Sequence, residues 1–165
     1  MDLGRVRVPP LASEVMSERV ELPTTVNGEC VFCAIAHGRA EASVVHDDGE
    51  LLGIVDLRPV TTGHLLVLPR EHAVGLGDLP PDVGARMFRV AQRLAGALRR
   101  SELRCEGVNL FLADGAAAGQ EIPHVHLHVF PRHAGDGFRL SADLRVRPRD
   151  ELDGIASAVR AALNG

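Results

Sequence analysis

Several short segments of the chain alternate apolar and polar residues with a period of two, which is the pattern of strands that bury one face. Residues 124–132, HVHLHVFPR, are the clearest case, because histidines stand at alternate positions and aliphatic residues fill the gaps between them. Asp47, Asp48 and Gly49 separate two further apolar runs, which indicates a hairpin. Besides 124–132, strands are predicted at residues 42–48, 50–57, 63–70 and 107–114.

A helical period replaces the alternation in residues 81–100, where apolar side chains recur every three or four positions. Pro81 suits the first turn of this helix, and a pair of arginines suits its last turn. A short helix in CVFCAIAHG would end at Gly38. The spacing of Leu152, Ile155, Val159 and Leu163 predicts an amphipathic C-terminal helix. Together these elements favour an α+β fold with a five-stranded antiparallel sheet.

The composition fits a single globular domain, because 45% of the 165 residues are hydrophobic and 24% are charged. Residues 1–29 carry three prolines without clear periodicity, so they are predicted to be an extension. The formal net charge of -4 disfavours a nucleic acid polymer as the partner. No apolar run approaches the ~20 residues of a membrane span, and the N-terminus lacks a signal-peptide core. A cytoplasmic protein that does not contact the membrane is expected.

The histidine row, His124, His126 and His128, needs a chemical explanation. A strand would place the three imidazoles on one face and the aliphatic residues between them on the other, where a core could cover the aliphatic residues. A purely structural role would require a hydrogen-bond partner for each buried ring. Two functional roles compete with it. The row could bind a metal, or one histidine could act as a nucleophile while its neighbours orient it and bind the substrate.

Two cysteines and a loop of small residues are further candidates for metal or anion binding. Cys30 and Cys33 in CVFC indicate a metal pair, a redox pair or two reduced thiols, whereas Cys105 stands alone and suits a small buried side chain. The loop ADGAAAGQEIPH places Gly119 and Gln120 shortly before the histidine row. Backbone amides in such a loop could approach an anion, although a tight turn explains the same composition.

Polar residues also mark the ends of two predicted strands. Asp56 could accept hydrogen bonds from sugar hydroxyls or act as a turn residue. His64 and His72 flank the strand at 63–70 and could add two imidazoles to the face of the histidine row.

Five segments of the chain stand in the order and spacing of a known family: CVFCAI, IVDLRPVTTGHLLVLPREH, NLFLADGAAAGQEIPH, HVHLHVF and PRHAGDGF. They resemble the histidine triad (HIT) superfamily, whose signature of three alternating histidines is matched by HVHLHVF. The resemblance covers about residues 30–140, which are expected to form the HIT domain. Residues 141–165 then form a C-terminal extension with the amphipathic helix, and residues 1–29 form the N-terminal extension.

The resemblance implies a nucleotide-binding enzyme that cleaves its substrate at the α-phosphate. His126 would attack the phosphorus, expel the leaving group and form a covalent nucleotidyl-histidine that water hydrolyses. His128 would hydrogen-bond the phosphate and the leaving group. Gln120 and the amides around Gly119 would hold the phosphate, and Asp56 would hold the ribose hydroxyls.

The same resemblance implies a purine nucleotide substrate that contains AMP. The apolar slot for the base would be formed by Val31, Phe32, Ile35 and Ile54, and His64 is counted with the substrate-binding residues. The substrate could be a dinucleoside polyphosphate, a nucleoside phosphoramidate or an adenosine phosphosulfate. The segment PRHAGDGF favours the dinucleoside polyphosphate hydrolases of the family.

A bacterial subgroup of this family carries a structural zinc, and the resemblance places its ligands at Cys30, Cys33, His72 and His124. Two thiolates and two imidazoles are the closed tetrahedral set of a structural zinc site. No organic cofactor is expected. The family habit also implies a homodimer that pairs two sheets through the long helix and an edge strand.

Two positions depart from the family pattern. Ala113 replaces a polar residue of several members, and Glu121 stands where a serine or threonine is common, so a carboxylate would lie near the phosphate. Two other functions stay open. One is a non-catalytic nucleotide-binding or sensing module. The other is a hydrolase that uses the histidine row itself to hold a zinc hydroxide.

Overall fold

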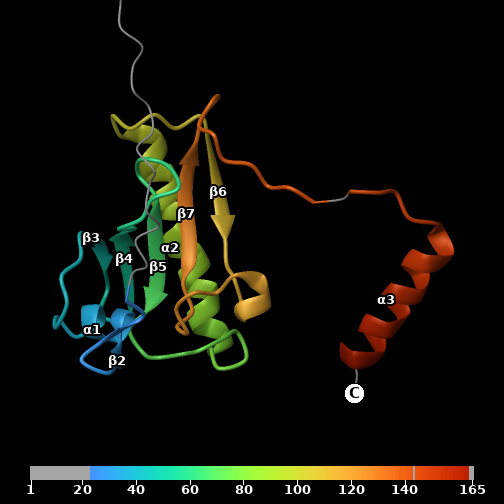
Figure 1. Cartoon of the computed structure of the whole chain (residues 1–165), viewed down its shortest axis with the longest axis horizontal. Coiled ribbons are helices and arrows are strands. Elements are labelled where there is room, and N and C mark those ends of the chain that lie inside the picture. Colours follow the sequence, from blue (N-terminus) through green and yellow to red (C-terminus); the bar gives the residue numbers. More distant parts are fainter. Residues whose placement is uncertain (1–22, 143, 164–165) are drawn as a thin grey trace, which may run out of the picture. The chain divides into compact units, whose positions relative to one another are not determined.

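The computed structural model describes residues 23–142 and 144–163 (Figure 1). The chain divides into two compact units, and the division falls between His133 and Ala134. The first unit contains the sheet and the histidine row, and the second contains one helix, so each unit is described by itself. Within the described ranges, no helix combines the length and the apolar character needed to cross a membrane.

Five strands form the main sheet in the spatial order β3-β4-β5-β7-β6, and every neighbouring pair is antiparallel. They are β3 (Val44–Asp47), β4 (Leu51–Val55), β5 (Leu65–Pro69), β6 (Gly107–Phe111) and β7 (Leu127–Arg132). The predicted α+β fold with a five-stranded antiparallel sheet is therefore confirmed. The last strand is shorter than expected, because regular pairing begins at Leu127 and leaves the first two histidines of the row before the strand.

The turn between β3 and β4 is held by the aspartates that the sequence places there. Asp47 Oδ1 accepts the Gly49 amide at 3.0 Å, and Asp48 Oδ1 accepts the Leu51 amide at 2.8 Å. Gly49 has a φ of 85°, which residues with a side chain rarely adopt. The side chains of the turn therefore satisfy its backbone, as expected of a hairpin with this composition.

A second, smaller hairpin was not among the expected elements. Strands β1 (Thr25–Val26) and β2 (Glu29–Cys30) pair across Asn27 and Gly28. Both turn residues have positive φ values, 52° and 81°, as a type I′ turn requires. The hairpin leads directly into the next helix and so delivers Cys30 to the site described below.

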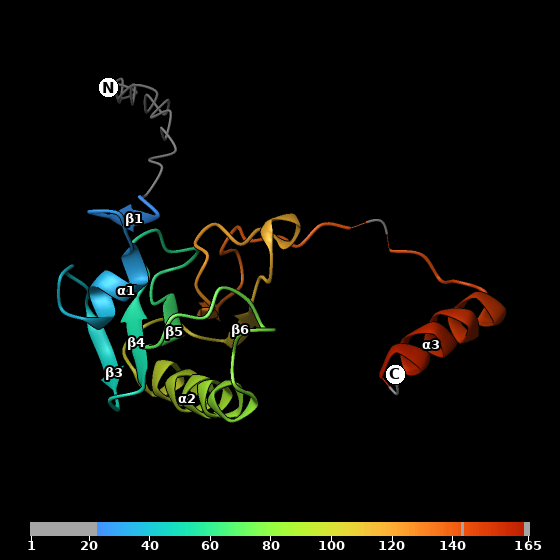
Figure 2. The same cartoon turned by 90° about the horizontal axis from the view of Figure 1, so that it is seen from below.

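The long helix α2 (Pro81–Arg100) covers one face of the sheet (Figure 2). Pro81 occupies its first turn and two arginines occupy its last turn, as the sequence predicted. Its apolar stripe packs against the strands in a core formed by Leu51, Leu65, Val67, Ala73, Met87, Val90, Ala91, Leu94, Leu98, Val125 and Val129. The aliphatic residues of the histidine row therefore face α2.

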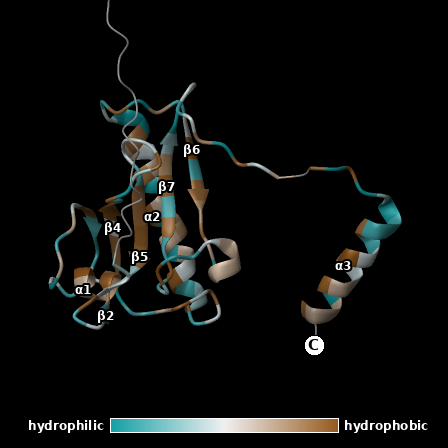
Figure 3. Cartoon of the chain, viewed as in Figure 1, coloured by the Kyte–Doolittle hydropathy of each residue, from teal (hydrophilic) through white to brown (hydrophobic). Residues whose placement is uncertain are grey.

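The short helix α1 (Val31–Ala36) lies on the opposite face of the sheet (Figure 2). A second core forms there from Phe32, Ala36, Leu52, Ile54, Leu66 and Leu68. Strands β4 and β5 are thus buried on both faces, which explains their nearly continuous apolar sequences. Figure 3 shows both strands mostly in the colour of hydrophobic residues. The helix ends just before Gly38, whose φ is 72°.

The second unit contains α3 (Arg149–Leu163), so a helix is present where the C-terminal pattern predicted one. Asp150 and Glu151 lie in its first turn, where acidic residues interact favourably with the helix dipole. The side chains of its apolar stripe are exposed to solvent, at Leu152, Ile155, Val159 and Leu163.

Candidate functional site

The histidine row runs from the end of a loop into β7. His124 and His126 are buried, and His128 is half-buried. The ring centroids of His126 and His128 are 4.9 Å apart, and Phe32 of α1 contacts the rings of His124 and His126 at 5.7 and 5.1 Å. The imidazoles therefore lie toward α1, opposite the aliphatic residues of the row. The alternation persists although the first two histidines precede the regular strand.

His124 joins Cys30, Cys33 and His72 in a cluster whose potential ligand atoms all lie within 4.8 Å of one another. The Nδ1 atom of His124 is 3.6 Å from each cysteine Sγ and 3.3 Å from His72 Nδ1, and Cys33 Sγ is 3.2 Å from His72 Nδ1. A tetrahedral site with Zn–S bonds of ~2.3 Å and Zn–N bonds of ~2.0–2.1 Å has ligand-to-ligand edges of roughly 3.3–3.8 Å. Four of the six donor pairs lie 3.2–3.6 Å apart, close to these edges, and the other two lie within 4.8 Å, so the cluster fits a zinc ion.

A hydrogen bond outside the cluster orients His124. Its Nε2 atom is 2.9 Å from the carbonyl oxygen of Pro69 at the end of β5. Because a carbonyl only accepts, Nε2 carries the ring proton and Nδ1 presents its lone pair to the thiols. This is the usual arrangement of a histidine that binds a metal through one nitrogen. Burial lowers the pKa of His124 to about 4, so that the ring is neutral.

Burial has the opposite effect on the pKa of Cys33. It raises the pKa of the Cys33 thiol to about 11, and the neighbouring Cys30 adds to this effect. A reactive redox cysteine needs a lowered pKa, so this environment does not favour the redox pair that the CVFC motif also allowed. A bound cation would stabilise the thiolate form instead.

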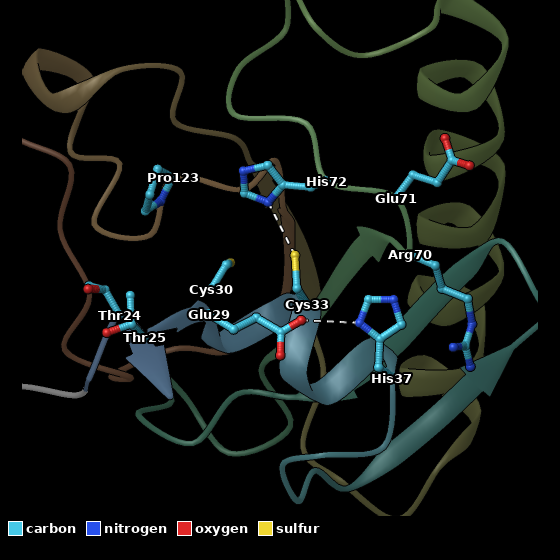
Figure 4. Close-up of a pocket in the computed structure, with 10 residues that line it drawn as sticks. All are labelled: Thr24, Thr25, Glu29, Cys30, Cys33, His37, Arg70, Glu71, His72 and Pro123. Atoms are coloured by element: carbon cyan, nitrogen blue, oxygen red, sulfur yellow. Dashed lines mark hydrogen bonds and ion pairs between the residues drawn. The ribbon is translucent and has the colours of Figure 1, made fainter. Parts of the chain in front are cut away.

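An open pocket of about 840 Å³ lies beside the cluster (Figure 4). Figure 4 shows Cys33 pointing at the ring of His72, with Cys30 next to it. In the same wall, a carboxylate oxygen of Glu29 lies 3.4 Å from His37 Nδ1. None of the three histidines of the row lines this pocket, whereas Cys30, Cys33 and His72 do, so the pocket borders the cysteine side of the cluster and not the proposed nucleophile.

His126 has one ring nitrogen fixed and one available. Its Nδ1 atom lies 2.6 Å from the backbone oxygen of His124, so Nδ1 donates its proton there and Nε2 keeps a lone pair. Burial lowers the pKa of His126, while the charges of Asp56 and Glu121 partly counteract the shift. A neutral imidazole with a free nitrogen is suited to nucleophilic attack.

His128 belongs to a second group, with His64 and Asp56. His64 Nδ1 accepts the backbone amide of Val60 at 3.1 Å, so its proton is on Nε2, which lies 2.9 Å from His128 Nδ1. His128 must therefore carry its own proton on Nε2. Burial lowers the pKa of His128 to about 3, helped by the neighbouring imidazoles, and burial also lowers the pKa of His64. Both rings are neutral, and a backbone amide fixes their direction.

Asp56, the first residue after β4, contacts both the following turn and His64. One carboxylate oxygen accepts the amide of Arg58 at 2.8 Å, and the other is 3.3 Å from His64 Nδ1. His64 is only 2% exposed, and it packs against His128 with ring centroids 5.0 Å apart. The buried imidazole of His64 therefore packs against the ring of His128 and fixes its position.

The loop before the histidine row is shaped by glycines and by one amide side chain. Gly115 and Gly119 have φ values of 86° and 87° and enclose the 3-10 turn η1 (Ala116–Ala118). Gln120 Oε1 accepts the Gly115 amide at 2.7 Å, and Gln120 Nε2 donates to the Val74 carbonyl at 2.6 Å. The side chain of Gln120 therefore braces the loop against the segment after β5.

The backbone amides of this loop are used in the same way. The Gly119 amide donates to the Ala116 carbonyl at 2.9 Å, and the Gln120 amide donates to the Gly115 carbonyl at 3.2 Å. The amides of Gly119 and Gln120 and the side chain of Gln120, which were expected to hold a phosphate, thus form hydrogen bonds that shape the loop.

The residues predicted for the base slot gather on the α1 side of the sheet. Phe32 and Ile54 are buried in the second core, and Val31 and Ile35 pack against it partly buried. Ala113, one of the two departures from the family pattern, is also buried.

An ion pair at this end of the sheet was not predicted. The guanidinium of Arg58 bonds to the carboxylate of Glu121, and the pair links the segment after β4 to the loop before the histidine row. The two residues are 63 positions apart, so no local pattern could reveal them. The guanidinium of Arg58 offsets the negative charge of Glu121, which the sequence places near the expected phosphate.

The antiparallel sheet with helices on both faces, and the histidine row that leads into its strand β7, define an α+β protein. The family model of the HIT domain matches residues 37–135, which is more than half of the chain. The chain belongs to the HIT family, which confirms the resemblance drawn from its motifs.

Three similar proteins support this assignment. A HIT-like protein of Mycobacterium tuberculosis is 41% identical over 134 residues, which are 81% of this chain and 92% of the relative. The crystal structure of a zinc-bound histidine triad family protein of Mycobacterium smegmatis has a TM-score of 0.64 and 44% identity, over 82% of this chain and 95% of that one. An adenylylsulfatase of Arabidopsis thaliana is 33% identical over 140 residues, 83% of this chain and 71% of the relative.

Proposed function

We propose that the protein is a nucleotidyl hydrolase or transferase that cleaves AMP-containing nucleotides at the α-phosphate through a covalent adduct on His126. The observation that carries the proposal is the 2.6 Å hydrogen bond from His126 Nδ1 to the carbonyl oxygen of His124. It keeps the Nε2 lone pair free beside the ring of His128. The adenylylsulfatase relative supports hydrolysis of a nucleotidyl bond.

In the first step, the lone pair of His126 Nε2 forms a bond to the α-phosphorus. The bond between phosphorus and the leaving group breaks, and its electron pair departs with the leaving group. His128 donates a hydrogen bond from Nε2 to the oxygens that gain charge. Water then attacks the phosphorus, the N–P bond breaks, and a nucleoside monophosphate leaves neutral His126 behind.

The remaining site residues bind and orient the substrate in this proposal. Asp56 holds the ribose hydroxyls, and the base occupies the apolar slot that Phe32, Ile35 and Ile54 form with Val31. Gly119 and Gln120 form the phosphate end of the site. His64 fixes the direction of the His128 proton, as its bond to the Val60 amide favours.

We further propose that Cys30, Cys33, His72 and His124 hold a structural zinc ion. The donor set, the spacing of its atoms and the zinc-bound relative of Mycobacterium smegmatis support this. Four protein ligands would leave no open position on such an ion, so it would hold the four side chains together and would take no part in the reaction. Its effect on catalysis would pass through His124, whose carbonyl orients His126.

The proposal also includes a homodimer in the cytoplasm, with a HIT domain at residues 30–140 between extensions at 1–29 and 141–165. Light scattering at micromolar concentration tests the assembly, and a monomeric mass would contradict it. Metal analysis tests the zinc. A content near zero in correctly folded protein would refute that part of the proposal.

The central experiment compares the wild type with His126→Ala and with His46→Ala, a control on the edge strand β3. Each protein is incubated with diadenosine tetraphosphate, adenosine phosphoramidate and adenosine phosphosulfate, and AMP release is followed by chromatography. Acid quenching and mass spectrometry then search for adenylylated protein. We expect turnover and an adduct in the wild type and the control, and a loss of about 10³-fold or more in His126→Ala.

Two other outcomes would replace the proposal. AMP binding without turnover of any of the three substrates would make the protein a nucleotide-binding module. Turnover that is lost on chelation and never yields an adduct would favour a zinc-hydroxide hydrolase. In the structure, His124 and His128 belong to two separate groups of potential ligands and His126 belongs to neither, so the row does not form one ligand set.

A further inference from the structure

The ion pair of Arg58 and Glu121 joins the two segments that carry the candidate site. Arg58 follows Asp56 by two positions, and Glu121 precedes His124 by three. The backbone of Arg58 is fixed by its 2.8 Å hydrogen bond to the Asp56 carboxylate. Arg58 is therefore bonded through its backbone to the carboxylate proposed to bind ribose, and through its guanidinium to the loop that leads to the nucleophile.

The pair lies next to the candidate site, because Arg58 is bonded to Asp56, whose carboxylate lies within 4.8 Å of ring nitrogens of His64 and His128. The carboxylate of Glu121 would repel any further anionic group of a nucleotide bound at His126. Arg58 offsets this repulsion. A substrate oxyanion would also be a good partner for Arg58, because phosphate and sulfate present several oxygens to the planar guanidinium.

Stability alone does not explain the pair. Its side chains are 49% and 68% exposed, and exposed ion pairs of this kind contribute little to folding. The pair of Arg104 and Glu106 is similarly exposed, but it joins neighbours on one segment. The Arg58 pair instead connects two loops across 63 positions and places a half-exposed cation at the site.

We propose that Arg58 is a specificity-determining residue that binds a negatively charged leaving group, and that Glu121 holds it in place in the free protein. The ligand chemistry is a phosphate or sulfate group directly beyond the bond that His126 breaks. Dinucleoside polyphosphates and adenosine phosphosulfate carry such a group, whereas the amine of a phosphoramidate does not. The inference rests on the proposed function and names the substrate class of the same site.

The test measures kcat/KM for diadenosine tetraphosphate, adenosine phosphosulfate and adenosine phosphoramidate. It uses the wild type, Arg58→Gln, Glu121→Gln and the control Arg104→Gln. We expect Arg58→Gln to lower kcat/KM for the anionic leaving groups by about tenfold or more, and for the phosphoramidate by less than about twofold. Glu121→Gln should raise the values for the anionic substrates, and the control should match the wild type.

Each outcome of the kinetic test has a defined meaning. Equal losses on all three substrates, or no loss on any, would overturn the inference. A loss confined to the tetraphosphate or to the phosphosulfate would support it and identify phosphate or sulfate as the group that Arg58 binds.

A binding measurement separates this inference from the proposed function. If the wild type turns over none of the substrates, the proposed reaction fails, but calorimetry with ADP and AMP still tests Arg58. ADP carries a β-phosphate in the place of a leaving group, and AMP does not. Arg58→Gln should weaken ADP binding by about tenfold and AMP binding by less than about twofold. Equal changes for both nucleotides would overturn the inference.

Discussion

His124 and His128 stand on one segment with a single histidine between them, yet their surroundings differ completely. The ring of His124 meets two thiols and a second imidazole, which come from other parts of the chain. The ring of His128 meets His64, which a backbone amide orients. Burial keeps both rings neutral, with pKa values of about 4 and about 3. Identical residues of one motif thus receive different chemistry from the partners that the fold brings to them.

His126 lies between these two regions and is connected to both. It donates to the backbone oxygen of His124 at 2.6 Å, and its ring contacts that of His128. We therefore expect substitutions in the metal cluster to lower mainly the free energy of unfolding. Substitutions at His128 should lower mainly the rate of the reaction. The following predictions test this division, beginning with the largest effect.

Cys33→Ser should release the metal and lower the free energy of unfolding by about 3 kcal/mol or more, because metal binding adds to folding stability. Bound zinc is measured by mass spectrometry and stability by urea unfolding. Cys105→Ser is the matched control, since the thiol of Cys105 donates to the Gly107 carbonyl at 3.2 Å and lies outside the cluster. Retention of one zinc per chain in Cys33→Ser would contradict the assignment.

His128→Ala should lower kcat by about 10²–10³-fold, because it removes a donor to the oxygens that gain charge in the transition state. Zinc content should stay close to that of the wild type, and the free energy of unfolding should fall by only about 1–2 kcal/mol, because the buried Nε2–H of His64 loses its partner. A variant that lost its zinc would show that the two regions are not independent.

Acidification should destabilise the protein through His64 and His128. Both rings have pKa values lowered by burial, so the unfolded state takes up protons below its ordinary histidine pKa of about 6.5 while the folded state does not. Stability is therefore greatest above that pH and falls as the pH decreases, down to about 3 for His128. In His128→Gln, unfolding at pH 5 should take up about one proton fewer than in the wild type. Unfolding curves at several pH values measure this difference, and equal slopes for the two proteins would refute it.

Gln120→Ala should have the smallest effect, a loss of about 1 kcal/mol or slightly more of unfolding free energy, because two hydrogen bonds to backbone groups disappear. The exposed Gln92 of α2 provides a control, and Gln92→Ala should change stability by less than about 0.5 kcal/mol. If both variants behave alike, the side chain of Gln120 does not brace the loop.

Local sequence signals account for most of the fold. The alternation at 124–132 predicted both faces of the histidine row, and Asp47, Asp48 and Gly49 predicted a turn that the structure contains. The hairpin at Asn27 and Gly28 was missed because its strands are two residues long and show no period. Its Asn-Gly pair was the available signal.

The site depends more on distant contacts, and the sequence predicted less of it. The four residues of the metal cluster were identified through family resemblance, since no local pattern links Cys30 to His124. The ion pair of Arg58 with Glu121 and the hydrogen bond between His64 and His128 span 63 and 64 positions. Such contacts arise only after the strands are arranged, so periodicity and turn residues carry no information about them.

The metal cluster also has a consequence for the order of folding. Cys30 and His124 are 94 positions apart, whereas β3, β4 and β5 are neighbours in sequence and in the sheet. Closing a long loop costs more entropy than closing a short one, and distant contacts tend to form late. The four ligands converge only when β5 and the segment before β7 are in place. Zinc binding would then be the last step of folding and would stabilise a sheet that has already formed.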